Sequence, residues 1–298
     1  MSRMRLLIGA SLVLGLAGTV TACDGSPAAP TPPTGDSSSG AQRSTGPIAF
    51  VSDRDGTEQI YLANEDGSAV TRLTPGAFPA WSRDGQRLAF SNAQRIYVIN
   101  VDGSGLQQLA SGWEPDWSPD GRFIVFRDLT ISISTVEVNG STQRRLYGSG
   151  HGDTGPAWSP DGQRIVFTNG SYYACEIFGL WVLNADGSGL QYINCDGELP
   201  AWSPDSSQIA FVAQPGSIDV SNADGSGRRT RVAGPAAFPD WTPDGRLIFT
   251  KSPSGNRNWY GPGQRIFISD GGLERQLIPE AAAPARSSYS DRQATWRR

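Results

Sequence analysis

Short apolar segments recur along most of this chain, and each follows a tight turn that begins just after a tryptophan. The turn has the pattern Trp-Ser-Pro-Asp-Gly, and the apolar segment after it ends on phenylalanine. Copies of the turn lie in residues 79–85, 115–121, 156–162, 200–206 and 239–245, and the apolar segments follow at 88–90, 124–126, 165–167, 209–211 and 247–249. Proline sets φ in advance, and glycine tolerates positive φ. The pattern therefore predicts a repeated β-hairpin, in which the tryptophan ends one strand and the apolar segment forms the next.

A second repeated turn divides each repeat again. Asp-Gly or Asn-Gly pairs occur at 66–67, 102–103, 139–140, 186–187, 224–225 and 270–271, each between two more strand-like segments. The repeated tryptophans are 36, 41, 44 and 39 residues apart, which is close to the roughly 40–45 residues of a four-stranded propeller blade. We therefore predict an all-β fold, a six-bladed β-propeller of four-stranded blades.

The first repeat lacks its first strand at the N-terminal side. The repeats begin at 47–50, a segment that matches the second strand of the other copies. Near the other end, Ala294-Thr-Trp296 resembles the Ala-Trp of the repeat. We expect this C-terminal strand to complete the first blade and close the ring, which removes the open edges. The alternative is that Trp296 belongs to a tail and that the ring closes in another way.

Residues 1–22 have the pattern of an export signal. Two arginines precede an apolar run over 6–17, which is too short to span a bilayer. The sequence Val-Thr-Ala-Cys, ending at Cys23, resembles the bacterial lipobox, whose cysteine becomes the lipidated first residue of the mature protein. We expect a lipoprotein signal peptide and a lipid anchor on Cys23. An ordinary signal peptide that is cleaved near Ala22 is the alternative.

Beyond the signal, the chain divides into a tether and one domain. Residues 23–46 are mostly Ser, Pro, Gly, Thr and Ala, which indicates a flexible tether. Residues 47–298 carry the repeats and form one domain, because each blade buries its faces only against its neighbours. The formal net charge is −4, and it becomes −6 without the two arginines of the signal. An acidic chain without a basic cluster argues against a nucleic-acid partner.

Cys175 and Cys195 are the two cysteines left after the anchor. They lie 20 residues apart in the fourth repeat. In an oxidising compartment such a pair favours a disulfide, which would contribute on the order of 3 kcal/mol in the chain-entropy model. A metal site is the alternative, but two thiols without a nearby histidine fall short of the usual four ligands.

The whole repeat, with Trp-Ser-Pro-Asp-Gly, Ile-Ala-Phe, Ile-Tyr, Asn-x-Asp-Gly and a short Leu-Thr strand, resembles the β-propeller of the TolB family over residues 47–296. The resemblance implies the fold. It does not imply one function, because similar blades occur in envelope scaffold proteins, in relatives of prolyl oligopeptidase and in some polysaccharide lyases. We expect no direct role in the Tol-Pal machinery, since the chain leaves no room for the N-terminal α/β domain of TolB and TolB is not anchored. The copies also vary, with Arg83 for proline, Ser206 for glycine and Thr242 for serine.

Catalytic chemistry finds little support in the sequence. The chain lacks a Gly-x-Ser-x-Gly motif, and its single histidine, His151, is too few for a metal lyase that relies on several. Hydrogen bonds to the backbone of their own turns explain the repeated aspartates, and packing within the blades explains the tryptophans. We predict that the chain is not an enzyme and that it uses no cofactor or metal ion.

Candidate binding residues lie in the longer loops, which we expect on the face opposite the short repeated turns. Variable loops on a rigid scaffold are where recognition usually resides, and aromatic residues with arginine are typical of protein interfaces. The candidates are Arg54, Trp113, Glu114, His151, Tyr172, Tyr173, Arg257, Trp259 and Tyr260. The alternative for each is a loop side chain that folds onto its own blade.

Together these features predict a non-catalytic bacterial lipoprotein, anchored outside the cytoplasm, whose propeller binds another protein of the cell envelope. A glycan-binding protein and a degenerate propeller hydrolase or lyase are the alternatives. The missing nucleophile and the shortage of histidines argue against the last of these.

Overall fold

The computed structural model describes residues 47–170, 178–252, 263–270, 272–278 and 291–297, and this part of the chain consists of strands joined by turns and loops. No helix occurs in these ranges, so none there could cross a membrane. The all-β prediction is confirmed for them. The predicted signal peptide, the lipidated Cys23 and the tether lie outside the described residues.

Four sheets are antiparallel and contain four strands each. One orders β23 (Asp291–Trp296), β1 (Ile48–Ser52), β2 (Gln59–Ala63) and β3 (Thr71–Pro75). A second orders β11 (Thr154–Trp158), β12 (Arg164–Asn169), β13 (Gly179–Asn184) and β14 (Gln191–Asn194). A third orders β15 (Gly197–Trp202), β16 (Gln208–Ala213), β17 (Ser217–Asn222) and β18 (Arg229–Val232). The fourth orders β19 (Ala236–Trp241), β20 (Leu247–Lys251), β21 (Arg265–Asp270) and β22 (Leu273–Gln276).

The remaining strands form one sheet of seven. It contains β4 (Ala77–Trp81), β5 (Arg87–Asn92), β6 (Arg95–Asn100), β7 (Gln107–Trp117), β8 (Phe123–Asp128), β9 (Ile133–Glu137) and β10 (Gln143–Tyr147). The 11-residue strand β7 is shared: its first half pairs with β6 and its second half with β8. Gly112 stands where the pairing changes, and a Cβ there would lie 2.2 Å from the carbonyl oxygen of Arg127. The sequence predicted two separate strands here, whereas the chain continues as one.

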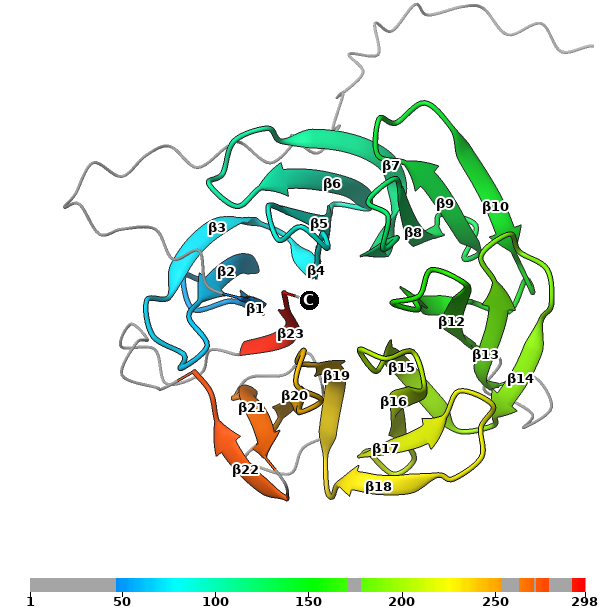
Figure 1. The fold of residues 1–298 in the computed structure, drawn as a ribbon. Coiled ribbons are helices and arrows are strands. Elements are labelled where there is room, and N and C mark those ends of the chain that lie inside the picture. The colour runs from blue at the N-terminus through cyan, green and yellow to red at the C-terminus, as the bar shows by residue number, and fades with distance from the viewer. Residues whose placement is uncertain (1–46, 171–177, 253–262, 271, 279–290, 298) are drawn as a thin grey trace, which may run out of the picture.

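The sheets stand around a common centre, in the propeller arrangement of four-stranded blades that the repeat predicts (Figure 1). The strands that end in tryptophan are innermost: β4, the second half of β7, β11, β15, β19 and β23. We call the side that carries the turns 82–85, 118–121, 159–162, 203–206 and 242–245 the turn face. The opposite side carries connections such as 53–58, 129–132 and 148–153, and we call it the loop face.

The predicted turns form as expected. In the turn that begins at Ser159, the amide of Gly162 donates to the carbonyl of Ser159 at 2.8 Å, and Gly162 has a φ of 73°. The carboxylate of Asp161 accepts hydrogen bonds from the Ser159 hydroxyl at 2.5 Å and from the Gln163 amide at 2.9 Å. Burial opposes these bonds, yet they hold the pKa of Asp161 below its usual range. The repeated aspartates therefore serve their own turns, as predicted.

Apolar side chains fill the space between neighbouring sheets. Trp202 of β15 is fully buried in a cluster with Val166 of β12 and Ile209 of β16. The phenylalanines of the repeated apolar segments are also fully buried: Phe50, Phe90, Phe126, Phe167, Phe211 and Phe249. Burying one such side chain contributes roughly 1.5–3 kcal/mol. The repeated tryptophans thus belong to the packing, which confirms that prediction.

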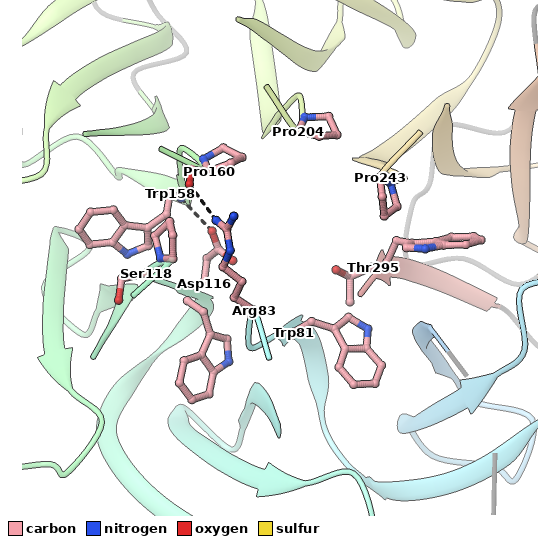
Figure 2. Close-up of a pocket in the computed structure, with 12 residues that line it drawn as sticks. Trp81, Arg83, Asp116, Ser118, Trp158, Pro160, Pro204, Pro243 and Thr295 are labelled. Carbon is pink, nitrogen blue, oxygen red and sulfur yellow. Dashed lines mark hydrogen bonds between the residues drawn. The ribbon is translucent and has the colours of Figure 1, made fainter. Parts of the chain in front are cut away.

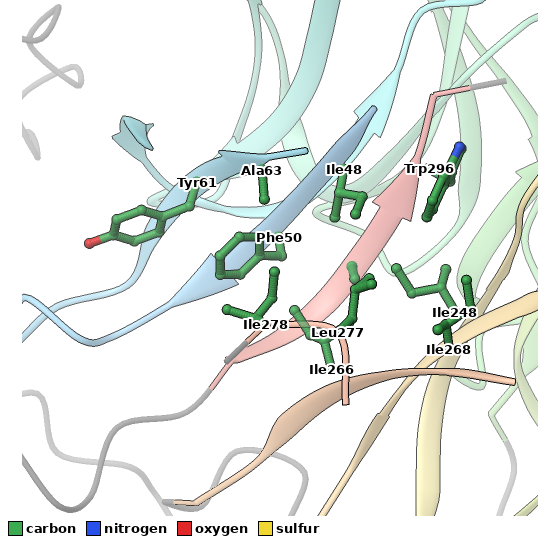
Figure 3. Close-up of a cluster of buried hydrophobic side chains, with 11 residues drawn as sticks. Ile48, Phe50, Tyr61, Ala63, Ile248, Ile266, Ile268, Leu277, Ile278 and Trp296 are labelled. Atoms are coloured by element: carbon green, nitrogen blue, oxygen red, sulfur yellow. The ribbon is translucent and has the colours of Figure 1, made fainter. Parts of the chain in front are cut away.

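β23 brings the last part of the chain beside the first strand. Ile48 of β1 pairs with Trp296, whose side chain is 4% exposed and packs near Ile248 and Ile266 (Figure 3). Asp240 of β19 accepts hydrogen bonds from the Thr295 hydroxyl at 2.9 Å and from the Trp296 amide at 3.0 Å. The segment 294–296 is therefore held from both sides, by β1 and by β19.

Candidate functional site

A β-bulge interrupts every innermost strand at the same place. In β4 the pairing shifts between Ala77 and Ala80, and the other innermost strands shift at the corresponding positions. The bulge residues all have φ between 50° and 58°: Phe78, Glu114, Gly155, Leu199, Phe238 and Gln293. This conformation costs residues other than glycine roughly 1–2 kcal/mol. Because such strain gathers at functional sites, the ring of bulges marks the centre as a candidate site.

The bulges surround a cavity of about 150 Å³ at the loop-face end of the centre. Its walls are residues 78–80, 114–116, 155–157, 199–201, 238–240 and 293–295. The walls are mostly apolar, with proline or alanine following each bulge residue. Among the described residues that line it, the ionisable side chains are the carboxylates of Glu114, Asp116 and Asp240. The cavity therefore combines apolar walls with three carboxyl groups.

Side chains tie neighbouring innermost strands together around this cavity. The carboxylate of Glu114 accepts a hydrogen bond from the Gly155 amide at 2.8 Å. Asp116 accepts one from the Trp158 amide, also at 2.8 Å. Between β23 and β4, the Gln293 side-chain oxygen accepts one from the Phe78 amide at 3.0 Å. The polar atoms of the walls thus hold the strands in place.

Trp113 and Glu114 lie together at the rim, within β7 and not in a loop as the sequence predicted, and Arg127 of β8 joins them. The guanidinium of Arg127 stands 4.7 Å from the centre of the Trp113 ring, and its Nη1 lies 3.8 Å from Glu114 Oε1. Burial raises the pKa of Glu114, while the Gly155 amide and Arg127 oppose that shift. An aromatic ring, a guanidinium and a shielded carboxylate form one cluster, which we call the rim cluster.

A rigid turn beside the rim cluster presents two apolar side chains to solvent. The Asp128 carboxylate accepts hydrogen bonds from the Thr130 amide at 2.8 Å and from the Ser134 hydroxyl at 2.8 Å, which fixes the loop after β8. Leu129 is 53% exposed and Ile131 is 37% exposed. Ile131 has a φ of 54°, which is rare for a β-branched residue. The turn therefore holds apolar groups outward in a strained conformation.

The loop that contains His151 packs against this turn. The Asp153 amide donates to the Ile131 carbonyl at 3.1 Å, and the Ile131 side chain reaches Gly152. Asp153 is fully buried and accepts hydrogen bonds from Ser149, and burial raises its pKa. His151 itself is exposed. The structure thus places Trp113, Glu114 and His151 in one region of the loop face.

Arg54 has a different environment from the one that the sequence predicted. It is 4% exposed, and its guanidinium lies over the rings of Tyr61 and Phe50 at 4.8 and 5.3 Å. Its Nε donates to the Ser52 hydroxyl at 2.9 Å. Stacking on two rings buries the long side chain, so Arg54 folds onto its own blade and is not an exposed binding residue.

The other candidates are not placed. Tyr172, Tyr173, Arg257, Trp259 and Tyr260 lie outside the described residues. Cys175 also lies outside them, and Cys195 is half-buried with a free thiol in the described part of the chain. The predicted Cys175–Cys195 disulfide therefore stays a prediction.

A second cavity lies at the turn-face end of the centre and has a volume of about 180 Å³ (Figure 2). Its walls include four of the repeated tryptophans and the turn prolines: Trp81, Trp117, Trp158, Trp296, Pro119, Pro160, Pro204 and Pro243. Arg83, which replaces a turn proline, reaches across the opening and donates to the Pro160 carbonyl at 3.1 Å. Asp116 lines both cavities.

Neither cavity has the donor set of a metal site. Within the described residues, no group of three or more histidine, cysteine, aspartate or glutamate side chains could hold a metal ion. The carboxylates of the walls accept hydrogen bonds from backbone amides, as described above for Glu114 and Asp116. What the site offers chemically is apolar contact, stacking and charge.

Comparisons with solved structures find the same fold in TolB proteins, while the family models and the curated proteins searched gave no match. TolB from Acinetobacter baumannii superposes with a TM-score of 0.70 at 16% identity, over 85% of this chain and 66% of that one. This chain thus spans slightly less than two thirds of that protein. A putative TolB from Agrobacterium tumefaciens gives 0.61 at 19% identity, over 78% and 88%. The predicted likeness to TolB-type propellers is confirmed for the fold.

Proteins of other kinds share the architecture. The nidogen/laminin complex matches with a TM-score of 0.65 at 12% identity, over 85% of this chain and 98% of that one. An oligogalacturonate lyase in complex with manganese gives 0.54 at 14% identity, over 80% and 75%. At such low identity these matches show the fold alone, so function must be argued from the residues of the site.

Sequence reasoning missed three residues of the rim region: Arg127, Leu129 and Ile131. Arg127 lies in a strand, and a charged residue in a strand indicates only that its side chain faces away from the core. The loop 128–132 has no glycine or asparagine to indicate positive φ, so the strained conformation was not predictable. The presence of two apolar residues, Leu129 and Ile131, in a short loop between strands was the available indication.

Proposed function

We propose that this chain is a non-catalytic, lipid-anchored protein of a bacterial envelope and that its loop face binds another envelope protein. The observation that carries the proposal is the rim cluster with the neighbouring Leu129 and Ile131. An aromatic ring, an arginine and projecting apolar groups are the residue types that contribute most to protein interfaces. The fold shared with TolB and with a propeller from the nidogen/laminin complex is compatible with such a role.

The rigidity of this surface supports the proposal. Asp128 fixes the turn, Glu114 fixes the rim, and the strained Ile131 is held by its neighbours. A partner would meet side chains that are already ordered, so it would lose less conformational entropy on binding. Leu129 is 53% exposed and Ile131 is 37% exposed in a strained loop, and the exposed part of this apolar pair favours a role in recognition.

We also propose that the ring has six blades and that the C-terminal strand closes it. The seven-stranded sheet divides at β7 into two sets of four strands, which together with the four separate sheets makes six. The pairing of β23 with β1, and its hydrogen bonds to Asp240 of β19, support closure by this strand.

The proposed lipid anchor and the proposed location outside the cytoplasm are inferred from the sequence of residues 1–23. The lipobox at Cys23 supports anchoring outside the cytoplasm. A glycan ligand is the second candidate, since exposed aromatic residues also stack on sugars. A lyase activity like that named for the manganese-bound neighbour is less favoured, because this chain has one histidine and that histidine is exposed.

Site-specific photo-crosslinking in native membranes tests the proposal. A photoreactive amino acid replaces Leu129 in one version of the full chain and Leu190 in another; both side chains are exposed, at 53% and 41%. We expect a discrete protein adduct from position 129 and none from position 190. Equal adducts from both positions, or none from either, would contradict the proposal.

Binding measurements with the captured protein complete the test. Leu129→Asp should weaken binding at least tenfold without moving Tm, because the side chain makes little contact in the free chain. Leu190→Asp should change neither quantity. An adduct that carbohydrate-cleaving enzymes remove would favour the glycan candidate, and turnover of oligogalacturonate would overturn the non-catalytic role.

A further inference from the structure

The turn face departs from its own repeat at a position beside Trp158. After each turn, one residue begins the next strand, and its amide donates to the turn serine: Arg87 to Ser82, Phe123 to Ser118, Arg164 to Ser159 and Gln208 to Ser203. Arg87 lies over Trp117 at 4.7 Å, and Arg164 lies over Trp202 at the same distance. Phe123 occupies the equivalent position before Trp158, so a phenyl ring stands where two other repeats have a guanidinium.

A groove of about 770 Å³ opens at this place, between β8–β10 and β11–β13. Phe123, Leu146, Trp158 and Ala185 supply its apolar walls. It shares Arg83, Ser118, Pro119, Trp158 and Pro160 with the cavity at the turn-face end of the centre. The groove and that cavity therefore form one continuous hollow, which we call the seam groove.

The second departure, Arg83, lines the same hollow. Its guanidinium is exposed and donates to the Pro160 carbonyl at 3.1 Å, as Figure 2 shows. Arg144, also exposed, donates to the Asp186 carbonyl at 2.9 Å. A guanidinium has five N–H donors, so each arginine can serve a further carbonyl. The seam groove thus presents donors that are already directed at backbone carbonyl oxygens.

Each carboxylate that lines the seam groove, from Asp120, Asp161 and Asp186, has one oxygen engaged in its own turn. Asp120 Oδ1 accepts from the Ser118 hydroxyl at 2.6 Å and from the Arg122 amide at 3.0 Å. Asp161 is engaged in the same way. A ligand that suits these walls brings apolar rings and bare carbonyls but few N–H groups. A proline-rich segment has that composition, because proline lacks the N–H and the polyproline II helix leaves its carbonyls unbonded. Such segments dock in aromatic-lined grooves.

We propose that a segment of this same chain, residues 27–33, docks in the seam groove in the polyproline II conformation. Its sequence is Pro-Ala-Ala-Pro-Thr-Pro-Pro, and Asp36 follows it. The docking requires neither the lipid anchor nor an envelope partner. In an anchored protein it turns the turn face toward the membrane and leaves the loop face open.

The place where the described chain begins supports this occupant. The Pro47 carbonyl accepts a hydrogen bond from the Arg297 amide at 2.7 Å. The Arg297 side chain lies against Gly85, in the turn that carries Arg83, since a Cβ on Gly85 would be 2.2 Å from Arg297 Cδ. Two contacts therefore link Pro47 to the turn whose Arg83 lines the seam groove. A random coil of 14 residues, the number from 33 to 47, spans about 20 Å.

A peptide titration tests the proposal. In the full chain, purified in detergent, residues 27–33 are replaced by a Gly-Ser stretch of equal length, and a fluorescein-labelled peptide of residues 24–36 is added. We expect a saturable rise in fluorescence anisotropy. Arg83→Pro and Phe123→Arg each install the residue that other repeats carry, so they preserve the fold, and each should weaken binding at least tenfold. Gln208→Arg adds the same arginine at the equivalent position away from the groove and should leave binding unchanged.

Two further measurements identify the segment that binds in the seam groove. The unsubstituted chain should bind added peptide more weakly than the Gly-Ser chain, because its own segment competes, and it should remain monomeric in sedimentation. No binding to the Gly-Ser chain, equal binding of a peptide with every proline replaced by alanine, or unchanged binding by both groove variants would overturn the proposal. A dimer that the Gly-Ser replacement dissociates would overturn docking within one chain in favour of docking between two copies.

Discussion

Two carboxylates of this molecule have opposite pKa shifts, one in a repeated turn and one at the rim. Hydrogen bonds in the turns hold the pKa of Asp161 low, although burial opposes them, and burial at the rim raises the pKa of Glu114. Asp161 is exposed and accepts hydrogen bonds from the Ser159 hydroxyl and the Gln163 amide. The side chain of Glu114, by contrast, is only 14% exposed. The carboxylate of Asp161 therefore stabilises its turn, whereas burial of Glu114 favours the protonated, neutral form of its carboxyl group.

Glu114→Gln tests the rim carboxylate. Because burial raises the pKa of Glu114, the folded chain binds the proton more tightly than the unfolded chain does. Stability from this group is therefore lost as the pH rises through the raised pKa. Glutamine cannot ionise, so the Tm of the variant should rise relative to that of the parent as the pH increases above the ordinary pKa of glutamate, about 4. Thermal unfolding at several pH values measures the difference in Tm. If the Tm of the parent instead rises relative to that of the variant, the ion pair with Arg127 outweighs the cost of burying the charge.

The repeated turn is the element whose side chains do most for local structure. The hydroxyl of Ser159 donates to Asp161, lies 3.0 Å from the Arg164 carbonyl, and accepts from the Arg164 amide at 2.9 Å. Ser159 is fully buried. Ser159→Ala leaves these groups without their partner, and we expect it to lower the free energy of unfolding by about 1–3 kcal/mol in urea. Ser104→Ala, in an exposed turn, should change it by less than about 0.5 kcal/mol.

The innermost strand β23 offers a second test at this scale. Asp240→Ala removes the acceptor of the buried Trp296 amide and of the Thr295 hydroxyl, at an expected cost of about 1–3 kcal/mol. Amide exchange should quicken in β23 and β1 and stay unchanged in β12, because the opening is local. Equal exchange throughout would mean that β23 does not depend on β19.

Periodicity predicted the strands and turns, but not which side chains face a ligand. Residue pattern indicates that Arg54 lies in a loop, and only the positions of Phe50 and Tyr61 show that it folds inward. Ile131 adopts positive φ without a glycine, because Asp128 and neighbouring loops hold it there. The continuous strand β7 was not predicted. Its change of partner at Gly112, from β6 to β8, depends on how closely the Arg127 carbonyl approaches, and only the structure gives that distance. Phe123, by contrast, stands out once the repeats are aligned.

At the scale of the whole molecule, the two cavities at the centre of the ring differ in the residues that form their walls. The loop-face end is bordered by carboxylates, and the turn-face end is bordered by tryptophan, proline and Arg83. The chain also enters the ring at the turn face, next to Arg297. If the turn face of an anchored protein lies toward the membrane, the loop face stays open to an envelope partner, which is compatible with both proposals.

The predicted disulfide is a test of compartment. Protein isolated from its native compartment should yield a Cys175–Cys195 peptide in non-reducing mass spectrometry. Its reduction should lower stability by at most on the order of 3 kcal/mol and leave the other blades formed, since each blade packs only on its neighbours. Two free thiols in such protein would contradict the pairing.

Cys23 decides whether the whole molecule is held at a membrane. The apolar run before it is too short to span a bilayer, so attachment depends on the lipid, and stable attachment needs more than one acyl chain. We expect the parent to pellet with membranes after cell fractionation and Cys23→Ser to appear in the soluble fraction. Cys195→Ser serves as the control, because it removes a cysteine of the propeller and should stay with the membranes. If Cys23→Ser remains membrane-bound after high-salt washing, the anchor lies elsewhere and the lipobox interpretation is wrong.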